Sequence, residues 1–361
     1  MEIGSMLEIQ PSALFEGNRT GSFALPLEAD ASYHASYYNT GRSAITHLLQ
    51  FLGRSRRVFL PSFICTSVTD AVHRAGNPVV FYPVGEDLQP DSSFLSSASP
   101  APGDLVYICQ YFGTVIEDDA MELFLSLQKK GILLIEDITM SLLSTAGAHF
   151  AFGDYLIGSI RKWFAVPDGG ILYGKEKLPE LPGDVQSVNE YTTYYFTAQM
   201  MKQMYLDAPD LYDKDVYLSL MRHANDVLFS DYTIRPMSDL GMRLLESTDV
   251  AQVRKQREDN YRLLHGLLSD EEAITLLPAP ADGMIPFCLF LLNEKRDDLL
   301  RRLIDADIYC NIHWRPNDAT DRFPSSCALA KNCLSIPADQ RYGASHMQHI
   351  ATVLKDALSF L

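Results

Sequence analysis

Two side chains, those of a lysine and an aspartate, could act together on one aromatic ring. Lys162 lies in the run 158–170, which mixes small, aromatic and charged residues, and Asp137 follows the apolar stretch 131–135. An amine can hold the aldehyde of pyridoxal phosphate as a Schiff base, and a carboxylate can keep the pyridine nitrogen of that cofactor protonated, so that the ring accepts electrons. The pair therefore predicts a pyridoxal phosphate site in which Lys162 and Asp137 are catalytic.

A small-residue turn that opens an apolar-faced helix offers a place for the phosphate of this cofactor. The turn is Thr40-Gly41-Arg42-Ser43. The first turn of a helix presents unpaired N–H groups and the positive end of the helix dipole, and a glycine lets the chain approach an anion closely. Ser43 and Ser159 add hydroxyl donors. We therefore predict that Thr40, Gly41, Arg42, Ser43 and Ser159 bind the cofactor.

Each of these signals also has an ordinary explanation. Lysine side chains are mostly exposed, and an aspartate after a strand can cap a helix. Loops at the carboxyl ends of parallel strands nevertheless carry ligands in open α/β sheets, which favours a binding role for Asp137. Ser159 and Lys162 also match the Ser-x-x-Lys signature of penicillin-binding serine enzymes. The Ser-Asp-Asn and Lys-Thr-Gly partners of that signature are missing downstream.

In their order and spacing, these pieces resemble the DegT/StrS-type sugar aminotransferases (the DegT/DnrJ/EryC1/StrS family), within fold type I of the pyridoxal phosphate enzymes. The resemblance runs through most of the chain. The matching segments are residues 41–45, 58–67, Gly153-Asp154, Ser159, Lys162, Gly169-Gly170, and residues 234–240, 257–261, 308–314 and 334–337. The resemblance implies an α/β fold, with a large domain built on a mostly parallel central sheet and a smaller C-terminal α+β domain.

The resemblance also implies how the chain is divided and assembled. We expect an N-terminal arm over residues 1–36, a large pyridoxal phosphate-binding domain with a helical bridge over residues 37–240, and a small domain over residues 241–361. The expected assembly is a homodimer with a shared active site. The segment 233–238 looks like the one that reaches the partner's site, and Arg235 is the residue expected to cross and bind there.

The activity that the resemblance implies is transamination in sugar biosynthesis. An amino acid, glutamate or glutamine, gives its amino group to the cofactor, and a keto compound, a nucleotide-linked keto sugar, then takes it. Asp137 stabilises the protonated ring. Lys162, once released, is placed to act as general acid and base, because an amine beside a cationic ring has a lowered pKa.

Four positions depart from the pattern of the family where it touches cofactor or substrate. Gln110 occupies the usual histidine position, Met140 stands where a glutamine is common, and Thr233 stands where an asparagine is expected. Cys65 falls at or near the aromatic residue that stacks on the pyridine ring, and Phe63 is two residues away as a substitute. The resemblance therefore adds Phe63, Cys65, Gln110 and Arg235 to the cofactor-binding residues.

Three other functions stay open. The first is a pyridoxamine-dependent dehydratase of the same family, although such enzymes typically replace the lysine with histidine. The second is a fold type I lyase or decarboxylase, because the bond that stands perpendicular to the ring decides the reaction. The third is a non-catalytic protein that keeps the fold after losing the substrate site, since a fold does not determine a function.

Composition and charge agree with a large intracellular enzyme. The 361 residues are 47% hydrophobic, enough for a sizeable core and two domains. A net charge of −16 argues against a nucleic-acid partner. Six cysteines without zinc or disulfide spacing indicate no metal site and a reducing cytoplasm. The sequence shows no secretory signal and no apolar run of membrane-spanning length, so we expect a cytoplasmic protein without membrane contacts.

Alternating strands and helices position the predicted site. The pattern predicts strands over residues 57–60, 79–82, 105–109, 132–135, 155–157, 170–173, 287–292 and 310–314. It predicts helices over residues 69–75, 120–130, 296–305 and 345–361, and a mostly helical segment over residues 187–268. The stretch 92–103, rich in Ser, Pro and Ala, reads as a loop.

Overall fold

The computed structural model describes residues 2–14, 23–30, 32–145, 147 and 149–361. Its strands are β1 (Ile3–Gly4), β2 (His34–Tyr38), β3 (Val58–Pro61), β4 (Val79–Tyr82), β5 (Leu105–Cys109), β6 (Leu133–Asp137), β7 (Tyr155–Gly158), β8 (Gly170–Gly174), β9 (Thr275–Leu276), β10 (Leu289–Leu292), β11 (Ile308–Tyr309) and β12 (Cys333–Ile336). Its helices are α1 (Gly41–Leu52), α2 (Thr66–Arg74), α3 (Ser92–Ser97), α4 (Asp118–Lys129), α5 (Glu190–Asp207), α6 (Lys214–Ser230), α7 (Asp239–Glu246), α8 (Val250–Leu268), α9 (Arg296–Asp305), α10 (Pro324–Asn332) and α11 (Ala344–Ser359).

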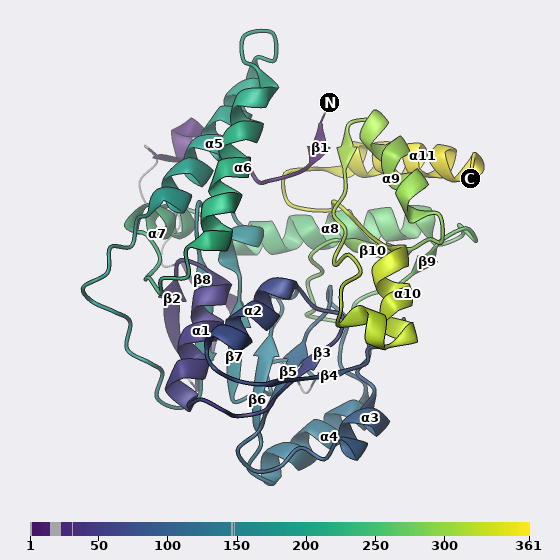
Figure 1. Ribbon diagram of the computed structural model, residues 1–361. Helices are drawn as coiled ribbons and strands as arrows, with labels where there is room; N and C mark the ends of the chain where they lie inside the picture. The colour runs from purple at the N-terminus through teal and green to yellow at the C-terminus, as the bar shows by residue number, and fades with distance from the viewer. Residues whose placement is uncertain (1, 15–22, 31, 146, 148) are drawn as a thin grey trace. The chain divides into compact units, whose positions relative to one another are not determined.

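Seven strands form one sheet, in the order β2-β8-β7-β6-β5-β3-β4 (Figure 1). The pairs β3 with β4, β3 with β5, and β5 with β6 are parallel, whereas the edge strand β2 pairs with β8 in antiparallel fashion. Helices separate most of the parallel strands along the chain, as crossover connections between parallel strands require. The predicted α/β fold class with a mostly parallel central sheet is therefore confirmed.

The chain forms two compact units, each assembled from separate segments. The first unit comprises the described residues up to Ser5 together with Arg54–Leu156 and Ala251–Leu361, and the second comprises Met6–Gly53 and Ile157–Val250. The division into an arm, a large domain and a small domain at residues 36 and 240 stays a prediction. Residues 1, 15–22 and 31 of the predicted arm lie outside the described residues.

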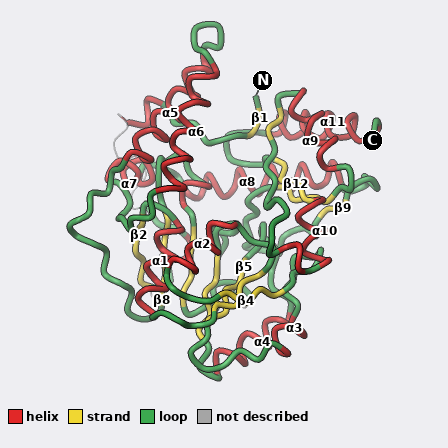
Figure 2. The backbone as a smooth tube through the Cα atoms, viewed as in Figure 1, coloured by secondary structure: helices red, strands yellow, loops and turns green. Residues whose placement is uncertain are grey.

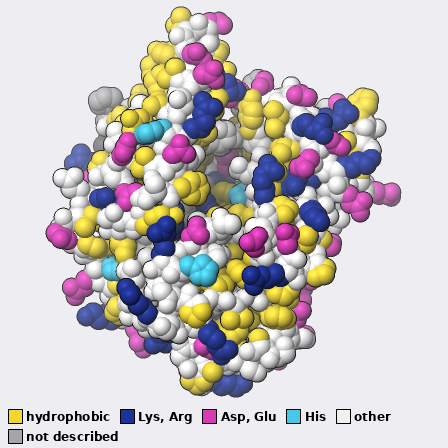
Figure 3. All heavy atoms as spheres, viewed as in Figure 1, with side chains coloured by type: hydrophobic (Ala, Val, Ile, Leu, Met, Phe, Trp, Pro, Cys, Tyr) yellow, Lys and Arg dark blue, Asp and Glu magenta, His cyan; other side chains and the backbone are white. Residues whose placement is uncertain are grey.

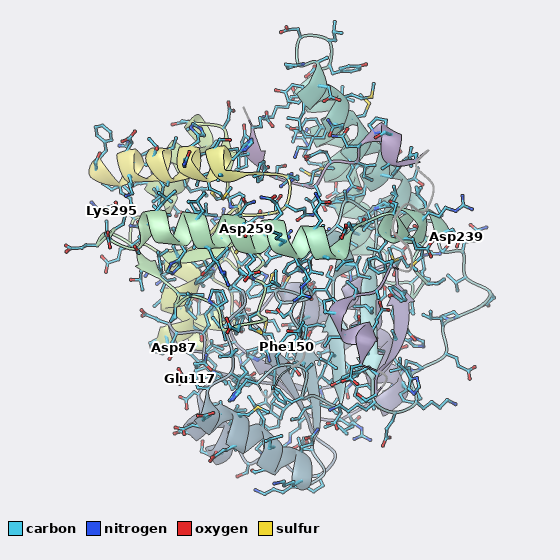
Figure 4. All side chains as sticks on the ribbon, turned by 180° about the vertical axis from the view of Figure 1, so that it is seen from behind. Asp87, Glu117, Phe150, Asp239, Asp259 and Lys295 are labelled. Carbon is cyan, nitrogen blue, oxygen red and sulfur yellow. The ribbon has the colours of Figure 1, made fainter. Side chains whose placement is uncertain are left out.

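The first unit is built around apolar strands. Every residue of β5 is buried, as is expected of a parallel strand that is covered on both faces. Its core includes Phe59, Val106, Phe124 and Leu134, and it continues to Phe290 of β10. A second core lies among the helices α8, α9 and α11 and the antiparallel sheet β12-β10-β9. Figure 2 shows α9 and α11 side by side, and α8 is the helix that carries the labelled Asp259 in Figure 4.

The second unit combines the antiparallel pair of β2 and β8 with helices. Helix α1 packs on β8, and α5 packs along α6 (Figure 1). Tyr191, Tyr195 and Ala198 of α5 and Ala224 of α6 form the core of that helix pair. Asp239, labelled in Figure 4, opens the short helix α7 that follows.

Most of the predicted elements are confirmed within a few residues, and two are wrong. The stretch that starts at Ser92, predicted as a loop, begins with α3. Asp91 caps this helix by accepting a hydrogen bond from the N–H of Phe94 (2.8 Å), and Leu95 is fully buried. The predicted strand 310–314 is wrong because only Asn311 pairs there, through an isolated bridge to Ser335. The short strand β11 ends just before it.

Candidate active site

Asp137 is the last residue of β6, and both of its carboxylate oxygens are held. Its Oδ1 accepts a hydrogen bond from the N–H of Thr139 (2.9 Å), and its Oδ2 accepts one from the hydroxyl of Tyr107 (2.7 Å). The main-chain N–H of Gln110 donates to the carbonyl of Asp137 (2.9 Å), so the backbone is fixed as well. A carboxylate has about four acceptor positions. Two contacts therefore set the orientation of this group and leave it able to bind a further donor.

Glu136, the residue before Asp137, is fully buried, and its carboxylate holds a later loop of the chain in place. Its Oε1 accepts hydrogen bonds from Nε2 of Gln110 (2.7 Å) and the N–H of Ala151 (2.9 Å), and its Oε2 accepts from the N–H groups of Phe152 and Gly153 (both 3.0 Å). Burial raises the pKa of Glu136 above its ordinary value, although these donors oppose the shift. Gln110 is itself fully buried, so its side chain supports this loop from within.

Phe63 and Cys65, both predicted to lie near the ring of the cofactor, differ in accessibility. The Phe63 side chain is fully buried against the rings of Tyr111 and Trp314, whose centroids lie 5.8 and 5.2 Å away. The hydroxyl of Tyr111 also donates to the carbonyl of Phe63. Cys65, at the N-cap of α2, is only partly buried. Of the two side chains, only that of Cys65 keeps a surface for a ligand.

The start of α1 and the loop after β7 meet in the second unit. Oγ1 of Thr40 accepts a hydrogen bond from the N–H of Ser43 (3.0 Å), which caps the helix. A Cβ atom added to Gly41 would lie 3.3 Å from the carbonyl oxygen of Gly158 and 3.7 Å from Cβ of Ser159. This contact is tight for any side chain. The structure thus brings the predicted residues Thr40, Gly41, Ser43 and Ser159 together at the positive end of a helix of 12 residues.

Lys162 ends a short 3₁₀ helix, Ile160–Lys162, in the loop between β7 and β8. The N–H of Ile160 donates to the carbonyl of Gly169 (3.0 Å), which closes the loop at its base. Trp163, the next residue, is completely buried, whereas Lys162 is partly exposed. The anchored neighbours restrict the position from which the side chain of Lys162 extends.

The side chains of the two predicted arginines contact their own chain near the end of α6. The guanidinium of Arg42 lies 4.4 Å from the ring centroid of Tyr232 and donates to the carbonyl of Asp231 (3.3 Å). Arg235 donates to the carbonyl of Gln186 (2.9 Å) and forms an ion pair with the carboxylate of Asp231 (3.4 Å). The main chain of Arg42 remains in the first turn of α1. The binding of Arg235 at a partner's site stays a prediction.

Sequence reasoning did not find three residues that hold the Asp137 region: Tyr107, Thr139 and Glu136. The sequence did contain a signal for Tyr107, because its hydroxyl is the one polar side-chain group in a strand of otherwise apolar residues, β5. Tyr107 and Cys109 point to the same face of β5, and Cys109 pairs with Asp137 in the parallel register. The signal for Glu136 was weaker, since the donors to its carboxylate are main-chain groups of a later loop.

Comparison with known proteins identifies the fold of the chain, through solved structures of low sequence identity. No family model and no curated protein sequence matches the chain. Solved structures do match, among them Spr1654 from Streptococcus pneumoniae, which is provisionally named a sugar aminotransferase and was solved in its PLP form (TM-score 0.69, 13% identity, 99% of each chain covered). A DegT DnrJ EryC1 StrS aminotransferase from Brucella abortus matches with a TM-score of 0.60 and 16% identity, over 90% of this chain and 85% of the other.

A third match is GDP-4-keto-6-deoxy-D-mannose-3-dehydratase from E. coli, with a TM-score of 0.63 and 16% identity, over 91% of this chain and 89% of that enzyme. Identities this low show a shared fold. The chain therefore has the fold of these enzymes, as the resemblance implied.

Proposed function

We propose that this chain is a pyridoxal phosphate-dependent aminotransferase, which moves an amino group from glutamate or glutamine to a nucleotide-linked keto sugar. The observation that carries the proposal is the carboxylate of Asp137, which ends a strand of this fold with both oxygens held and with acceptor capacity left over. The resemblance of the motifs around Gly41, Lys162 and Gly169-Gly170 to those of sugar aminotransferases supports it, and so does the fold shared with such enzymes.

The chemistry of the side chains fits this cofactor. The start of α1, where Gly41 makes a tight contact with Gly158, suits a phosphate group, and the hydroxyl of Ser159 makes no capping bond to its own helix turn. The Asp137 carboxylate suits a protonated ring nitrogen. Bound pyridoxal phosphate supplies an electron sink for the cleavage of a bond at the amino acid's α-carbon.

Each predicted residue then has a role. Lys162 anchors the cofactor through its amine, and when released it holds or delivers the proton that moves during transamination. Asp137 keeps a proton at the ring nitrogen. The main-chain amides of Gly41 and Arg42 and the hydroxyl of Ser159 bind the phosphate. Cys65, which is partly exposed, is the side chain assigned to the ring. Phe63 and Gln110 are buried and act on their neighbours: Phe63 packs on Trp314, and Gln110 donates to Glu136.

The experiment that tests the cofactor assignment is reductive trapping. Purified protein incubated with pyridoxal phosphate should absorb in the visible range, and borohydride should fix the cofactor to the peptide that contains Lys162. The variant Lys162→Ala should lose the label. Lys177→Ala, which changes an exposed lysine of the loop that follows β8, is the matched control and should keep it. A label on another lysine, or a label retained by Lys162→Ala, would disprove the assignment.

A dehydratase is the second candidate, because one of the matching folds belongs to a keto-sugar 3-dehydratase. The presence of Lys162 favours transamination, since the dehydratases of the resembled family typically carry histidine there. Product analysis separates the two functions. Transamination yields an amino sugar in proportion to the 2-keto acid formed from the donor, whereas dehydration removes a hydroxyl group from the sugar.

We further infer a homodimer with shared sites. Figure 3 shows hydrophobic side chains gathered over the helix pair of α5 and α6. Leu211, in the loop between these helices, is 80% exposed, and Val216 in the first turn of α6 is 43% exposed. Exposed apolar patches of this kind often mark protein interfaces. The net charge of −16 supports the absence of a nucleic-acid partner. Among the described residues, no helix combines the length and apolar character that a membrane crossing requires.

A further inference from the structure

The hydroxyl of Tyr107 contacts the carboxylate that we assign to the ring nitrogen. Its hydroxyl donates to Oδ2 of Asp137 at 2.7 Å, the length of a strong hydrogen bond to a charged acceptor. We propose that Tyr107 is a positioning residue that keeps Asp137 in its anionic form, so that the proton shared with the cofactor stays on the ring nitrogen. This inference rests on the proposed function and adds a residue to it.

The position of Tyr107 is fixed from several sides. It is completely buried in the middle of β5, and its carbonyl accepts a hydrogen bond from the hydroxyl of Tyr82 on β4 (2.8 Å). In the parallel register, Cys109 pairs with Asp137, and Tyr107 lies two residues earlier on the same face of the strand. The phenol therefore reaches the carboxylate from a rigid strand, which is the arrangement that sets an orientation most precisely.

The hydroxyl of Tyr107 is a donor to Asp137 that stays protonated. Burial, followed by the negative charge of Asp137, raises the pKa of Tyr107 well above its ordinary value. The phenol thus keeps its proton at neutral pH. The main-chain N–H of Thr139 on Oδ1 cannot lose its proton either. Asp137 is consequently bound by two permanent donors.

Permanent donors decide where a shared proton resides. Hydrogen bonds to a carboxylate stabilise its anionic form and weaken its affinity for another proton. When a ring nitrogen and Asp137 share one proton, the two donors favour the state in which the carboxylate is charged and the ring carries the proton. Removal of the Tyr107 hydroxyl shifts that proton toward Asp137. The ring then accepts electrons less well.

The direct test replaces the hydroxyl alone. Tyr107→Phe protein should be loaded with pyridoxal phosphate labelled with ¹⁵N in its ring, and the ¹⁵N chemical shift should move toward the value of an unprotonated pyridine. The rate of the half-reaction with the amino donor should fall roughly tenfold, because one hydrogen bond to a charged group is lost. The KM for the donor should stay unchanged, since Tyr107 does not touch substrate.

Tyr173→Phe is the matched control. It also removes one hydroxyl from a fully buried tyrosine of the same sheet, on β8, which is separated from the strand of Asp137 by β7. This variant should leave the ¹⁵N shift and the rate as in the unaltered protein. Equal effects of the two substitutions would mean that Tyr107 merely packs in the core, and the inference would be overturned.

A second variant tests the same idea and does not depend on the fold tolerating Tyr107→Phe. Site-specific incorporation of 4-aminophenylalanine at position 107 keeps a polar group of the same shape but makes it a weaker donor, so the ¹⁵N shift should move toward the unprotonated value. No movement would contradict the inference. Failure of the unaltered protein to bind pyridoxal phosphate through Lys162 would instead contradict the proposed function, so the two failures can be told apart.

Discussion

The carboxylate of Asp168 accepts two hydrogen bonds from Ser238, one from the N–H (2.9 Å) and one from the hydroxyl (2.8 Å). Ser238 also caps α7, because its Oγ accepts a hydrogen bond from the N–H of Gly241 (3.0 Å). The contact therefore ties the loop that carries Lys162 to the segment that carries Arg235. Asp168 is fully buried, and burial raises its pKa to about 6, although Ser238 and the charge of Arg161 oppose the shift.

The raised pKa makes the stability of the protein depend on pH. The ordinary value for an aspartate is 3.8, so the folded state binds the proton of Asp168 more tightly than the unfolded state does. The contribution of Asp168 to the free energy of unfolding therefore decreases as the pH rises from about 4 through about 6, by up to about 3 kcal/mol. Asp168→Asn should remove this dependence and keep one acceptor for the N–H of Ser238, while its NH2 group can meet the Ser238 hydroxyl only as a donor.

Urea unfolding of both proteins between pH 4 and pH 7.5 checks this expectation. The variant should gain stability relative to the unaltered protein as the pH rises. Asp339→Asn serves as the control: burial raises the pKa of Asp339, but Arg341 and Arg257 outweigh it and lower the value to about 2, below the window. Its stability difference should therefore stay constant over the same range. If the stability difference between Asp168→Asn and the unaltered protein were also constant over this range, the pKa of Asp168 would not be raised.

Asp137→Asn should leave cofactor binding in place and nearly abolish the reaction. The amide keeps the shape of the side chain, but it carries no charge to hold a proton on the ring nitrogen. We expect the half-reaction with the amino donor to slow by a factor on the order of a hundred or more. Stopped-flow absorbance of the loaded protein measures this rate. A rate within a few-fold of that of the unaltered protein would remove Asp137 from its role.

Subunit mixing tests whether the sites are shared. Lys162→Ala and an inactive Arg235→Ala variant should each fail alone. After mixing and exchange, half of the dimers are mixed, and each mixed dimer contains one site with both residues intact, so roughly a quarter of the original activity should return. Native mass spectrometry establishes that exchange has occurred. A monomeric protein, or exchanged subunits that stay inactive, would refute a shared site.

The amino acceptor can be identified from the pyridoxamine form of the protein. We expect nucleotide-linked keto sugars to restore the visible absorbance rapidly and plain 2-keto acids to do so slowly. A site for dicarboxylates would need a bidentate arginine. Arg315, after Trp314, is the candidate, and Arg322→Ala is the matched control because both side chains are exposed. Rapid turnover with keto acids alone, abolished in Arg315→Ala and kept in Arg322→Ala, would overturn the sugar assignment.

Local sequence patterns predicted most of the strands and helices, whereas they could not predict the side-chain contacts between strands. Periodic apolar residues predicted β5 and α9 at the bounds that the structure has. Helix α3 was missed because serine-rich segments usually form loops, but here Oγ of Ser96 donates to the carbonyl of Ser92 one turn back (2.8 Å), within the helix. The pairing of Tyr107 with Asp137 depends on strand register, which spacing along one chain does not contain.

The carboxylate of Glu136 has a consequence for how the sequence around it can change. Its oxygens bind main-chain N–H groups of Ala151, Phe152 and Gly153, and these groups are the same for nearly every residue type. These bonds therefore hold the path of the loop without selecting residue types, whereas the positive φ of Ala151 (63°) and the packing of Phe152 in the core limit which side chains fit there. An inserted or deleted residue would move the donors out of reach. Natural variation in this loop should accordingly preserve its length more strictly than its composition.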